Sequence, residues 1–220
     1  MMTLKIAGIS AMATAAPETR LPPFELIAGN VCLDFVNTLD NRPSGEPKEL
    51  IGSFLDLARF AQESGILPAK DGKYLVGRLN FHRAEAETAL RRALELREVM
   101  YAVFSAVLRR KSSPPAALAT LNAHIRDSAE HSRLVPVGKG YEWRFDDLKS
   151  AYDALLWPIA RAAAELLASG DLAMVRACSE ATCQWFFLDT SKNHHRRWCS
   201  MKICGNRTKV RKFYARKKTA

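Results

Sequence analysis

The spacing of apolar residues along the chain predicts a mainly helical protein. Apolar side chains recur at intervals of three and four residues, the period of an amphipathic helix that buries one face. The pattern holds over five stretches: residues 47–64, 73–81, 84–110, 116–130 and 147–168. Pro158 lies inside the last of them, and we expect it to kink that helix near Trp157 because proline donates no backbone hydrogen bond.

One stretch departs from this helical period. Residues 133–137 and 141–145 contain β-branched and aromatic side chains and flank the turn Gly138-Lys139-Gly140. Two such runs around a glycine-containing turn predict a β-hairpin. We therefore expect a helical body that carries a small β-hairpin.

Residues 29–38 form a short apolar segment that contains two polar side chains, Asp34 and Asn37. A carboxylate or an amide inside an apolar segment must be hydrogen-bonded, since an unpaired buried polar group costs free energy. The two side chains therefore predict either a structural anchor for a neighbouring loop or the polar wall of a ligand pocket.

Arg97 interrupts the apolar face of the helix predicted at 84–110. A buried guanidinium needs an acidic partner. Glu98 is expected on a different side of the helix, so we predict that Asp34 pairs with Arg97. Otherwise Arg97 would extend to the surface, make another structural pair, or bind the carboxylate or phosphate of a ligand.

Charge is distributed unevenly along the 220 residues. The chain has 33 Lys and Arg against 23 Asp and Glu, a net charge of +10. Residues 191–220 hold eleven of the basic residues and no acidic one, which leaves the rest of the chain with a net charge of −1. Such a basic tail favours a polyanionic partner, with nucleic acid ahead of an anionic membrane. A tail that is merely solvated is the alternative.

The other totals are ordinary for a globular protein, with 48% hydrophobic and 25% charged residues. No apolar run approaches the roughly 20 residues of a membrane span. Residues 1–20 contain only a weak, interrupted apolar stretch, so we predict a disordered leader on a cytoplasmic protein.

Four cysteines near the C-terminus form two pairs of equal internal spacing. Four residues separate Cys178 from Cys183, and four separate Cys199 from Cys204. Four thiolates suit the tetrahedral coordination of Zn²⁺, and such a closed shell is structural because no position remains for substrate or water. We predict one structural zinc ion in a treble-clef-like finger, whose second cysteine pair opens a helix over residues 204–217.

Two other uses of these cysteines are open. An iron–sulfur cluster also takes four thiolates, although its familiar spacings differ. Cys199 and His195 would form a nucleophile–base pair on proximity alone, although no third group is evident to orient the histidine. The fifth cysteine, Cys32, lies in an apolar run and is expected to be a small buried hydrophobe.

The basic tail supplies the candidate nucleic-acid contacts. They are Lys192, Arg196, Arg197, Lys202, Asn206, Arg207, Lys209, Arg211 and Lys212. Trp198, Phe213 and Tyr214 lie among them, as aromatic side chains do on surfaces that stack on bases. Arg and Asn side chains can read base edges, whereas Lys mostly meets phosphate. The expected closest contacts are therefore Arg196, Arg197, Asn206 and Arg207.

Two motifs resemble a known pair of families. One reads Asp189-x-Ser191-Lys192-Asn193-x-x-Arg196-Arg197-Trp198-Cys199-Ser200-Met201-x-x-Cys204-Gly205-Asn206-Arg207 and resembles the CGNR zinc finger. The other, Gly29…Leu33-Asp34-Phe35-x-Asn37-Thr38, resembles the start of the ABATE domain that precedes this finger in bacterial stress-induced transcription regulators. The resemblance runs from about residue 24 to the end. It implies a DNA-binding finger, with the four cysteines as its zinc ligands, behind a helical, ligand-sensing domain.

The chain is therefore expected to be a zinc-finger DNA-binding transcription regulator that responds to stress or to a metabolite. The expected organisation is a disordered leader at 1–20, an ABATE-like helical domain at 21–171, and the finger with its basic helix at 172–220. DNA and a small-molecule effector are the expected partners, and no membrane contact is expected. A homodimer would supply the base contacts that one finger lacks. Such a protein would lie at the bacterial nucleoid.

Two other functions are open. The basic tail would equally serve an RNA-binding or translation-linked module. The body would alternatively be a small-molecule-binding enzyme with its site around Asp34, Asn37 and Arg97. Its sequence offers no nucleophile–base pair, glycine-rich phosphate loop or metal cluster, so we expect no enzymatic activity.

Overall fold

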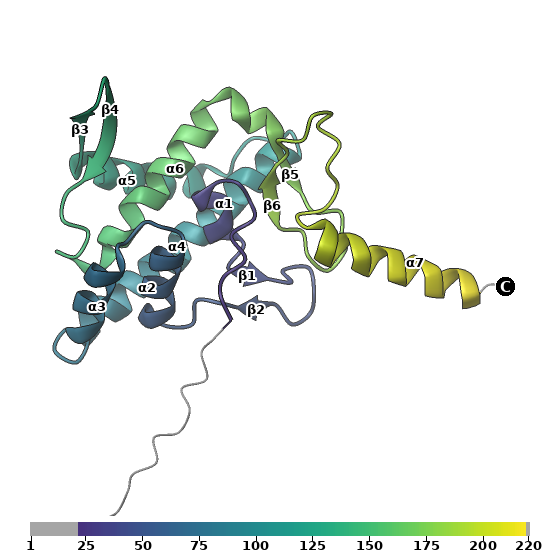
Figure 1. Cartoon of the computed structure of the whole chain (residues 1–220), viewed down its shortest axis with the longest axis horizontal. Helices are drawn as coiled ribbons and strands as arrows, with labels where there is room; N and C mark the ends of the chain where they lie inside the picture. The colour runs from purple at the N-terminus through teal and green to yellow at the C-terminus, as the bar shows by residue number, and fades with distance from the viewer. Residues whose placement is uncertain (1–21, 219–220) are drawn as a thin grey trace, which may run out of the picture.

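The computed structural model describes residues 22–218, and within them the chain is mainly helical, as predicted (Figure 1). The α-helices are α1 (Val31–Val36), α2 (Phe54–Glu63), α3 (Ala69–Gly77), α4 (Arg83–Leu108), α5 (Pro115–Glu130), α6 (Leu156–Ala168) and α7 (Asn206–Lys218). Single turns of other helix types are η1 (Tyr152–Leu155), η2 (Gly170–Met174) and η3 (Met201–Gly205). The leader predicted at 1–20 lies outside the described residues.

The strands form antiparallel pairs rather than one large sheet. They are β1 (Leu39–Asp40) with β2 (Lys48–Glu49), β3 (Ser132–Val137) with β4 (Gly140–Phe145), and β5 (Val175–Ala177) with β6 (Phe186–Leu188). The β3–β4 pair is the predicted hairpin, and its register places Leu134 opposite Trp143. It extends beyond the helices of the body (Figure 1), and the guanidinium of Arg161 in α6 lies 3.7 Å from the Trp143 ring centre.

Helix α4 is the centre of the body. It contacts α1, α2, α5 and α6, and its C-terminal part reaches β5 (Figure 1). The apolar period predicted over 84–110 supplies its inner face, where Ala93, Leu96, Met100 and Phe104 are all fully buried. A long helix with apolar side chains on one stripe thus supplies one side of a continuous core.

Two helices begin elsewhere than predicted. The helix expected from residue 47 begins at Phe54, because the side chain of Ser53 caps it by accepting from the backbone N–H of Asp56. Lys48 and Glu49, which were predicted to open this helix, instead form β2. The helix expected at 73–81 is α3, which starts four residues earlier, directly after Pro68. Capping explains the start of α2, whereas α3 has no side-chain cap and also ends four residues before the predicted end, at Gly77.

Pro158 does not lie in the middle of one long helix, as was predicted. The predicted helix over 147–168 is divided, since η1 covers its early part and α6 begins only at Leu156. Pro158 therefore lies in the first turn of α6, where a missing backbone N–H breaks no helical hydrogen bond.

Strand β6 joins the C-terminal segment to the body. All three of its residues are buried, and the backbone N–H of Leu188 donates to the carbonyl of Ala28 at 2.8 Å. The ring of Phe186 stacks on Tyr101 of α4 with 5.3 Å between centroids. The strand between the two cysteine pairs is thus part of the body's core. Among the described residues, no helix is both long and apolar enough to cross a membrane.

Candidate metal centre and nucleic-acid interface

The four cysteines predicted as metal ligands come from two loops. Cys178 directly follows β5 and Cys183 precedes β6, so the first pair occupies the turn between these strands. The backbone N–H of Cys178 donates to the carbonyl of Trp185 at 2.8 Å, which closes this turn. Cys199 precedes η3 and Cys204 lies within it, directly before α7. The second pair opens the final helix, as predicted.

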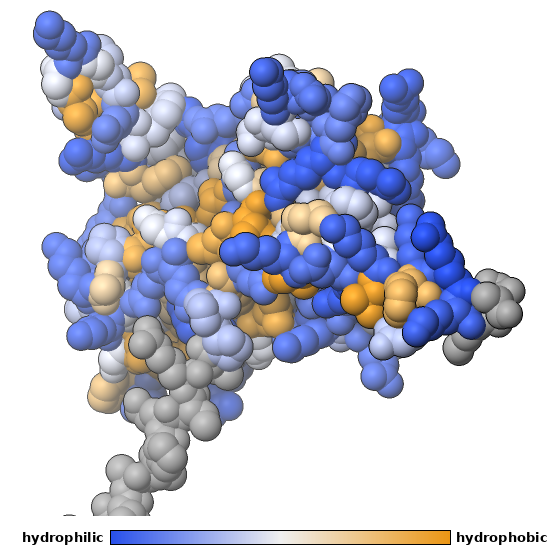
Figure 2. Space-filling view, turned by 45° about the vertical axis from the view of Figure 1, so that its right-hand side comes forward, coloured by the Kyte–Doolittle hydropathy of each residue, from blue (hydrophilic) through white to orange (hydrophobic). Residues whose placement is uncertain are grey.

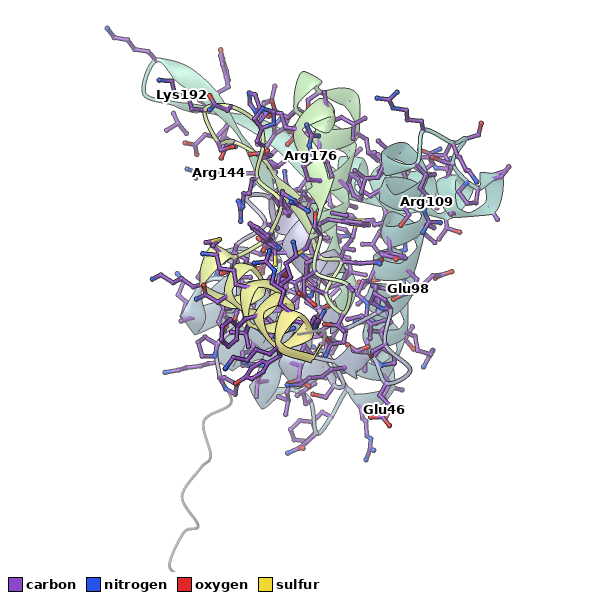
Figure 3. The ribbon with its side chains drawn as sticks, turned by 90° about the vertical axis from the view of Figure 1, so that its right-hand side faces the viewer. Glu46, Glu98, Arg109, Arg144, Arg176 and Lys192 are labelled. Atoms are coloured by element: carbon purple, nitrogen blue, oxygen red, sulfur yellow. The ribbon has the colours of Figure 1, made fainter. Side chains whose placement is uncertain are left out.

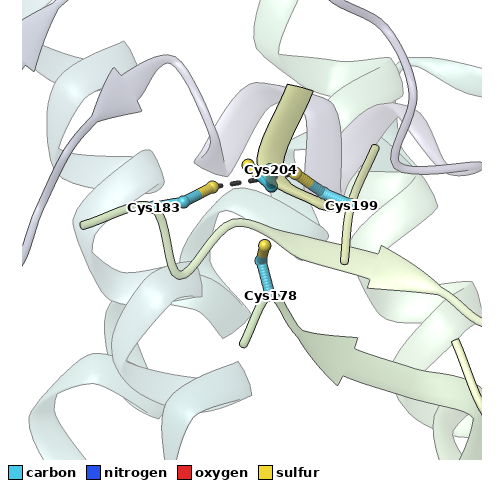
Figure 4. Close-up of side chains that lie close together, drawn as sticks. All are labelled: Cys178, Cys183, Cys199 and Cys204. Carbon is cyan, nitrogen blue, oxygen red and sulfur yellow. Dashed lines mark hydrogen bonds between the residues drawn. The ribbon is translucent and has the colours of Figure 1, made fainter. Parts of the chain in front are cut away.

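The four sulfur atoms converge on one point (Figure 4). All of them lie within 4.8 Å of one another. The Sγ atom of Cys199 is 3.7 Å from that of Cys183 and 3.6 Å from that of Cys204. Tetrahedral Zn–S bonds of ~2.3 Å place sulfur atoms ~3.8 Å apart, so these separations fit zinc. The four buried cysteines can hold one zinc ion in a closed, structural shell.

Close packing of the sulfurs changes their proton affinities. Hydrogen bonds with Cys183 and Cys199 lower the pKa of Cys178. The same contacts with Cys178 raise the pKa of Cys183 and of Cys199. Burial raises the pKa of Cys204. Four thiolates therefore gather here only with a cation to balance them, and a bound divalent ion provides that charge.

Glu180 lies between the first two cysteines and ties their loop to α7. It is buried, accepts a hydrogen bond from the Thr208 hydroxyl at 2.6 Å, and pairs with Arg211 at 2.7 Å. Glu180 was not among the residues predicted from the sequence. The available clue was that it and Asp189 are the only acidic residues after Asp171.

Asp189 organises the loop between β6 and the second cysteine pair. It is fully buried and accepts from the backbone N–H groups of Ser191 and Arg196 and from the Ser191 hydroxyl. These hydrogen bonds, above all the one from the Ser191 hydroxyl, hold the pKa of Asp189 below its usual range. The motif residues Asp189 and Ser191 thus shape the approach to Cys199.

Arg196 supports the finger from within. Its guanidinium donates to the backbone carbonyls of Trp198 and Cys199 and lies 4.4 Å from the ring centre of Phe187. Through Nε and Nη2, Arg196 thus braces the second ligand loop. The prediction that Arg196 is also among the closest nucleic-acid contacts stays a prediction.

Three other predicted contacts also touch the protein itself. The side-chain amide of Asn206 donates to the preceding turn, and Arg211 makes the ion pair described above. Arg207 lines a hollow of about 110 Å³ beside the cysteines, together with Glu25 and Asp40 of the body. All three remain exposed, so each can contact both the protein and a partner.

The remaining predicted contacts are exposed: Lys192, Arg197, Lys202, Lys209 and Lys212. Lys192 lies on the loop before the second cysteine pair, away from α7 (Figures 1 and 3). Helix α7 projects from the body, and the surface near its free end is largely hydrophilic with apolar groups between (Figure 2). The basic side chains thus occupy two places, the loop tip and the projecting helix.

The predicted ligand residues of the body are used to hold the structure together. The Asp34 carboxylate accepts from the backbone N–H of Ala28 at 2.9 Å. The Asn37 amide both donates to and accepts from the backbone of Phe186 in β6, at 2.9 Å each. These contacts match the structural anchor that was one of the two alternatives. Asn37 in particular fixes the finger strand against the body.

Arg97 has a different partner from the one predicted. Its side chain is only 4% exposed and makes two 2.6 Å hydrogen bonds to the Glu49 carboxylate. It also donates to Glu98 at 3.1 Å and to Thr38 at 3.3 Å. The predicted pair with Asp34 is therefore wrong, as is the expectation that Glu98 lies out of reach. Glu49 was missed because it lies on β2, within a stretch predicted to be helical.

Burial of Asp34 leads to a pH-dependent prediction. Desolvation raises the pKa of Asp34 to about 6, above its unfolded value, so ionising it costs the folded state free energy as pH rises through that range. An Asp34→Asn variant lacks this penalty. Its free energy of unfolding should therefore rise relative to wild type by about 1 kcal/mol between about pH 5 and pH 7.5, after discounting for partial exposure.

Urea unfolding of both proteins at the two pH values measures that difference. Any constant cost of the substitution cancels in the comparison between pH values. A difference that does not change with pH would show that Asp34 ionises in the folded protein as it does in the unfolded chain.

Comparison with known families agrees with the motifs. Residues 29–170 match the ABATE family, described as "Putative stress-induced transcription regulator", and residues 174–217 match the CGNR zinc finger. A search of curated proteins finds no match. The second match contains all four cysteines, and the order of the two is the one predicted from sequence. Together they indicate a regulatory, zinc-binding protein.

Proposed function

The chain belongs to the ABATE family and ends in a CGNR zinc finger, and on this premise we propose that it regulates transcription by binding DNA through the finger. In this proposal the finger and α7 contact DNA, and the body responds to stress through a small molecule. The family description and the charge of the C-terminal segment support the proposal from independent directions.

The observation that carries the proposal is the placement of α7. The helix starts two residues after the last zinc ligand, Cys204, and buried Glu180 holds its first turns through Thr208 and Arg211. Beyond these contacts it projects from the body (Figure 1). Its 13 residues include seven basic and no acidic side chains. At 1.5 Å per residue the helix is ~20 Å long, and its width suits the major groove of B-DNA.

Its exposed surface combines charge with apolar groups. Lys209 and Lys212 are exposed three residues apart, on one side of the helix, where they can meet phosphates. Val210, Phe213 and Tyr214 are each more than half exposed beside them. Apolar side chains in the major groove contact thymine methyl groups. A projecting helix of this composition is better suited to DNA than to solvent alone.

A salt series tests the electrostatic basis of the proposal. Replacing Lys209 and Lys212 together by Gln should weaken binding of the full chain to duplex DNA and reduce the slope of log K against log salt by about 2, since each phosphate contact contributes roughly 0.9. Fluorescence anisotropy with random duplex DNA measures both quantities.

The matched control removes two exposed lysines of the body, Lys111 and Lys139, again to Gln. Its overall charge change is the same, but its salt slope should equal that of wild type. Affinity that does not fall with salt in the wild-type protein, or equal slopes in both double variants, would remove α7 from the interface.

Competition distinguishes DNA from RNA. Unlabelled duplex DNA should displace the labelled probe at lower concentration than a structured RNA of equal length, because the deep, narrow major groove of A-form RNA does not admit a helix. The reverse order would favour the RNA-binding module. Deletion of residues 172–220 is not a suitable test, because β6 belongs to the core of the body.

A further inference from the structure

A cavity of about 730 Å³ opens in the body at the N-terminal end of α4. Its wall comes from the end of α3, the first turns of α4 and the segment that enters η1. This volume lies within the ~300–1,000 Å³ that is typical of small-molecule sites. The motifs singled out in the sequence do not contribute to it, so the cavity has no role in the finger or in the anchors of the body.

Tyr152 is the first sign that this cavity is a binding site. It lines the cavity and is only 6% exposed, and its buried hydroxyl has no hydrogen-bond partner among the described residues. Burial raises the pKa of Tyr152, Arg78 lowers it, and Glu85 raises it. Tyr152, Arg78 and Glu85 all line this cavity. A buried hydroxyl without a partner costs free energy that a ligand can recover.

Arg78 is the second sign. Its Nη2 lies 3.2 Å from Nε2 of His82, and Nδ1 of His82 lies 3.2 Å from the Glu85 carboxylate. A single tautomer fits this chain of contacts, with Nδ1–H donating to Glu85 and Nε2 accepting from Arg78. No acidic group within 4.0 Å of Arg78 is found in the part of the chain that the structure describes. The guanidinium thus keeps donors for an anion.

The charges of the wall limit which anion fits. Asp153 is paired with Arg92, whereas Glu85 keeps its negative charge beside the histidine. One guanidinium next to one carboxylate can hold a single negative charge, and a phosphate dianion would be repelled by Glu85. The start of α4 adds the positive end of a 26-residue helix on the same side. A carboxylate satisfies these conditions.

The rest of the wall is apolar or carries hydroxyl groups. Leu75, Ala84, Ala89 and Ala151 are aliphatic, and the ring of Tyr152 packs edge-on against Phe54. We propose that this cavity binds a small monocarboxylic acid with a flat apolar body, its carboxylate on Arg78 and the Tyr152 hydroxyl. The proposal names the ligand site of the sensing body and rests on the proposed function for its regulatory meaning.

The location of the cavity suits that role. Glu85 in its wall and Tyr101, which stacks on Phe186 of the finger strand, lie on the same helix α4. Their separation of 16 positions in the sequence corresponds to ~24 Å of continuous helix. The cavity and the finger thus touch opposite ends of one rigid element.

Calorimetry on the zinc-loaded full chain tests the proposal with phenylacetate and phenylacetamide as probes. The two compounds have the same shape and differ in charge. Phenylacetate should bind at least about tenfold more tightly, because only a carboxylate can form a bidentate ion pair with Arg78. Arg78→Gln should abolish that preference, and Tyr152→Phe should weaken phenylacetate alone by about fivefold.

Arg126→Gln is the matched control, since it removes an exposed arginine that does not line the cavity. It should bind phenylacetate as wild type does. Circular dichroism checks that each variant is folded. If Arg78→Gln does not fold, Tyr152→Phe still tests the cavity, because it keeps the ring and removes only the hydroxyl. Equal affinity for the two probes, retention of the preference in Arg78→Gln, or no binding of either at about 10 mM would overturn the proposal.

The two proposals fail separately. Calorimetry with phenylacetate requires no DNA, and the salt series requires no ligand. If the chain binds phenylacetate but not DNA, the cavity proposal stands and the proposed role of the finger is wrong. If it binds DNA but not phenylacetate, only the cavity proposal is wrong.

Discussion

Removal of zinc is expected to unfold the finger and to destabilise the body in the same transition. The reason is the position of β6, which lies between the two cysteine pairs and is buried against the body. Without metal the cysteine loops lose their closure, and the strand loses the frame that holds it. Structural zinc contributes apparent binding free energies of roughly 10–16 kcal/mol in isolated fingers, so a loss on the order of 5 kcal/mol in the whole chain is expected.

Thermal unfolding with and without an excess of chelator measures this loss, alongside metal analysis of the same samples. Cys204→Ser should reproduce the effect without chelator, because one thiolate fewer leaves the shell open. Cys32→Ala is the control. Cys32 is a buried thiol in α1 of the body, so its loss should cost about 1 kcal/mol and leave the zinc content at one per chain.

The contrary result would be a zinc-free chain that unfolds at the same temperature as the loaded one. It would mean that the contacts of Asn37 and Tyr101 with Phe186 hold the strand on their own. A separate early transition of small amplitude, with the main transition unchanged, would lead to the same conclusion.

Glu49→Gln is expected to cost about 3 kcal/mol of unfolding free energy, the range seen when one partner of a buried ion pair is removed. Arg97 is 4% exposed and its two shortest hydrogen bonds go to Glu49, so the substitution leaves a buried guanidinium with only Glu98 and Thr38. Neither group replaces a bidentate carboxylate.

Substitution of the other member of the pair, Arg97, should cost less unfolding free energy. Arg97→Met leaves Glu49 unpaired, but that side chain is 34% exposed and can be solvated by water. A cost of about 1–2 kcal/mol is expected, about half that of Glu49→Gln. Urea unfolding measures both. Glu142→Gln is the control, since Glu142 and its partner Arg144 are each 59% exposed and such pairs contribute within about 0.5 kcal/mol.

An equal cost for the two substitutions would show that the charges are solvated alike. A cost below that of Glu142→Gln would show that the pair is not the main support of β2. Either result would contradict the burial on which this asymmetry depends.

Zinc ligation was predictable because it depends on local chemistry. Two pairs of cysteines with equal spacing determine which atoms meet, whatever the body does around them, and the four sulfurs do meet. The long helix at 84–110 was predictable for a similar reason, since its apolar period continues over seven turns. In both cases several residues at regular spacing predict the same local structure.

Partners of single polar residues were not predictable. Arg97 required an acid, but the acid came from Glu49, 48 residues away and on a strand of two residues that no period reveals. The sequence also did not reveal that Nε and Nη2 of Arg196 donate to backbone carbonyls of its own loop. Charge and residue type say that a partner is needed, whereas only the tertiary fold decides which one.

The cavity was missed for the same reason. Its wall combines three segments, and Tyr152 and Arg78 are separated by 74 residues of sequence that carry no motif. An unpaired hydroxyl cannot be recognised before the neighbours that fail to pair with it are known.

Burial of β6 has a thermodynamic consequence for regulation. Because three residues of the zinc module belong to the core of the body, metal binding and folding of the body share one equilibrium. A compound that binds only the folded body must then tighten the hold on zinc, and zinc must tighten the hold on that compound by the same factor. If the proposed function holds, metal supply and metabolite supply would therefore reach α7 as one reciprocal signal, and a shortage of either one would weaken the binding of the other.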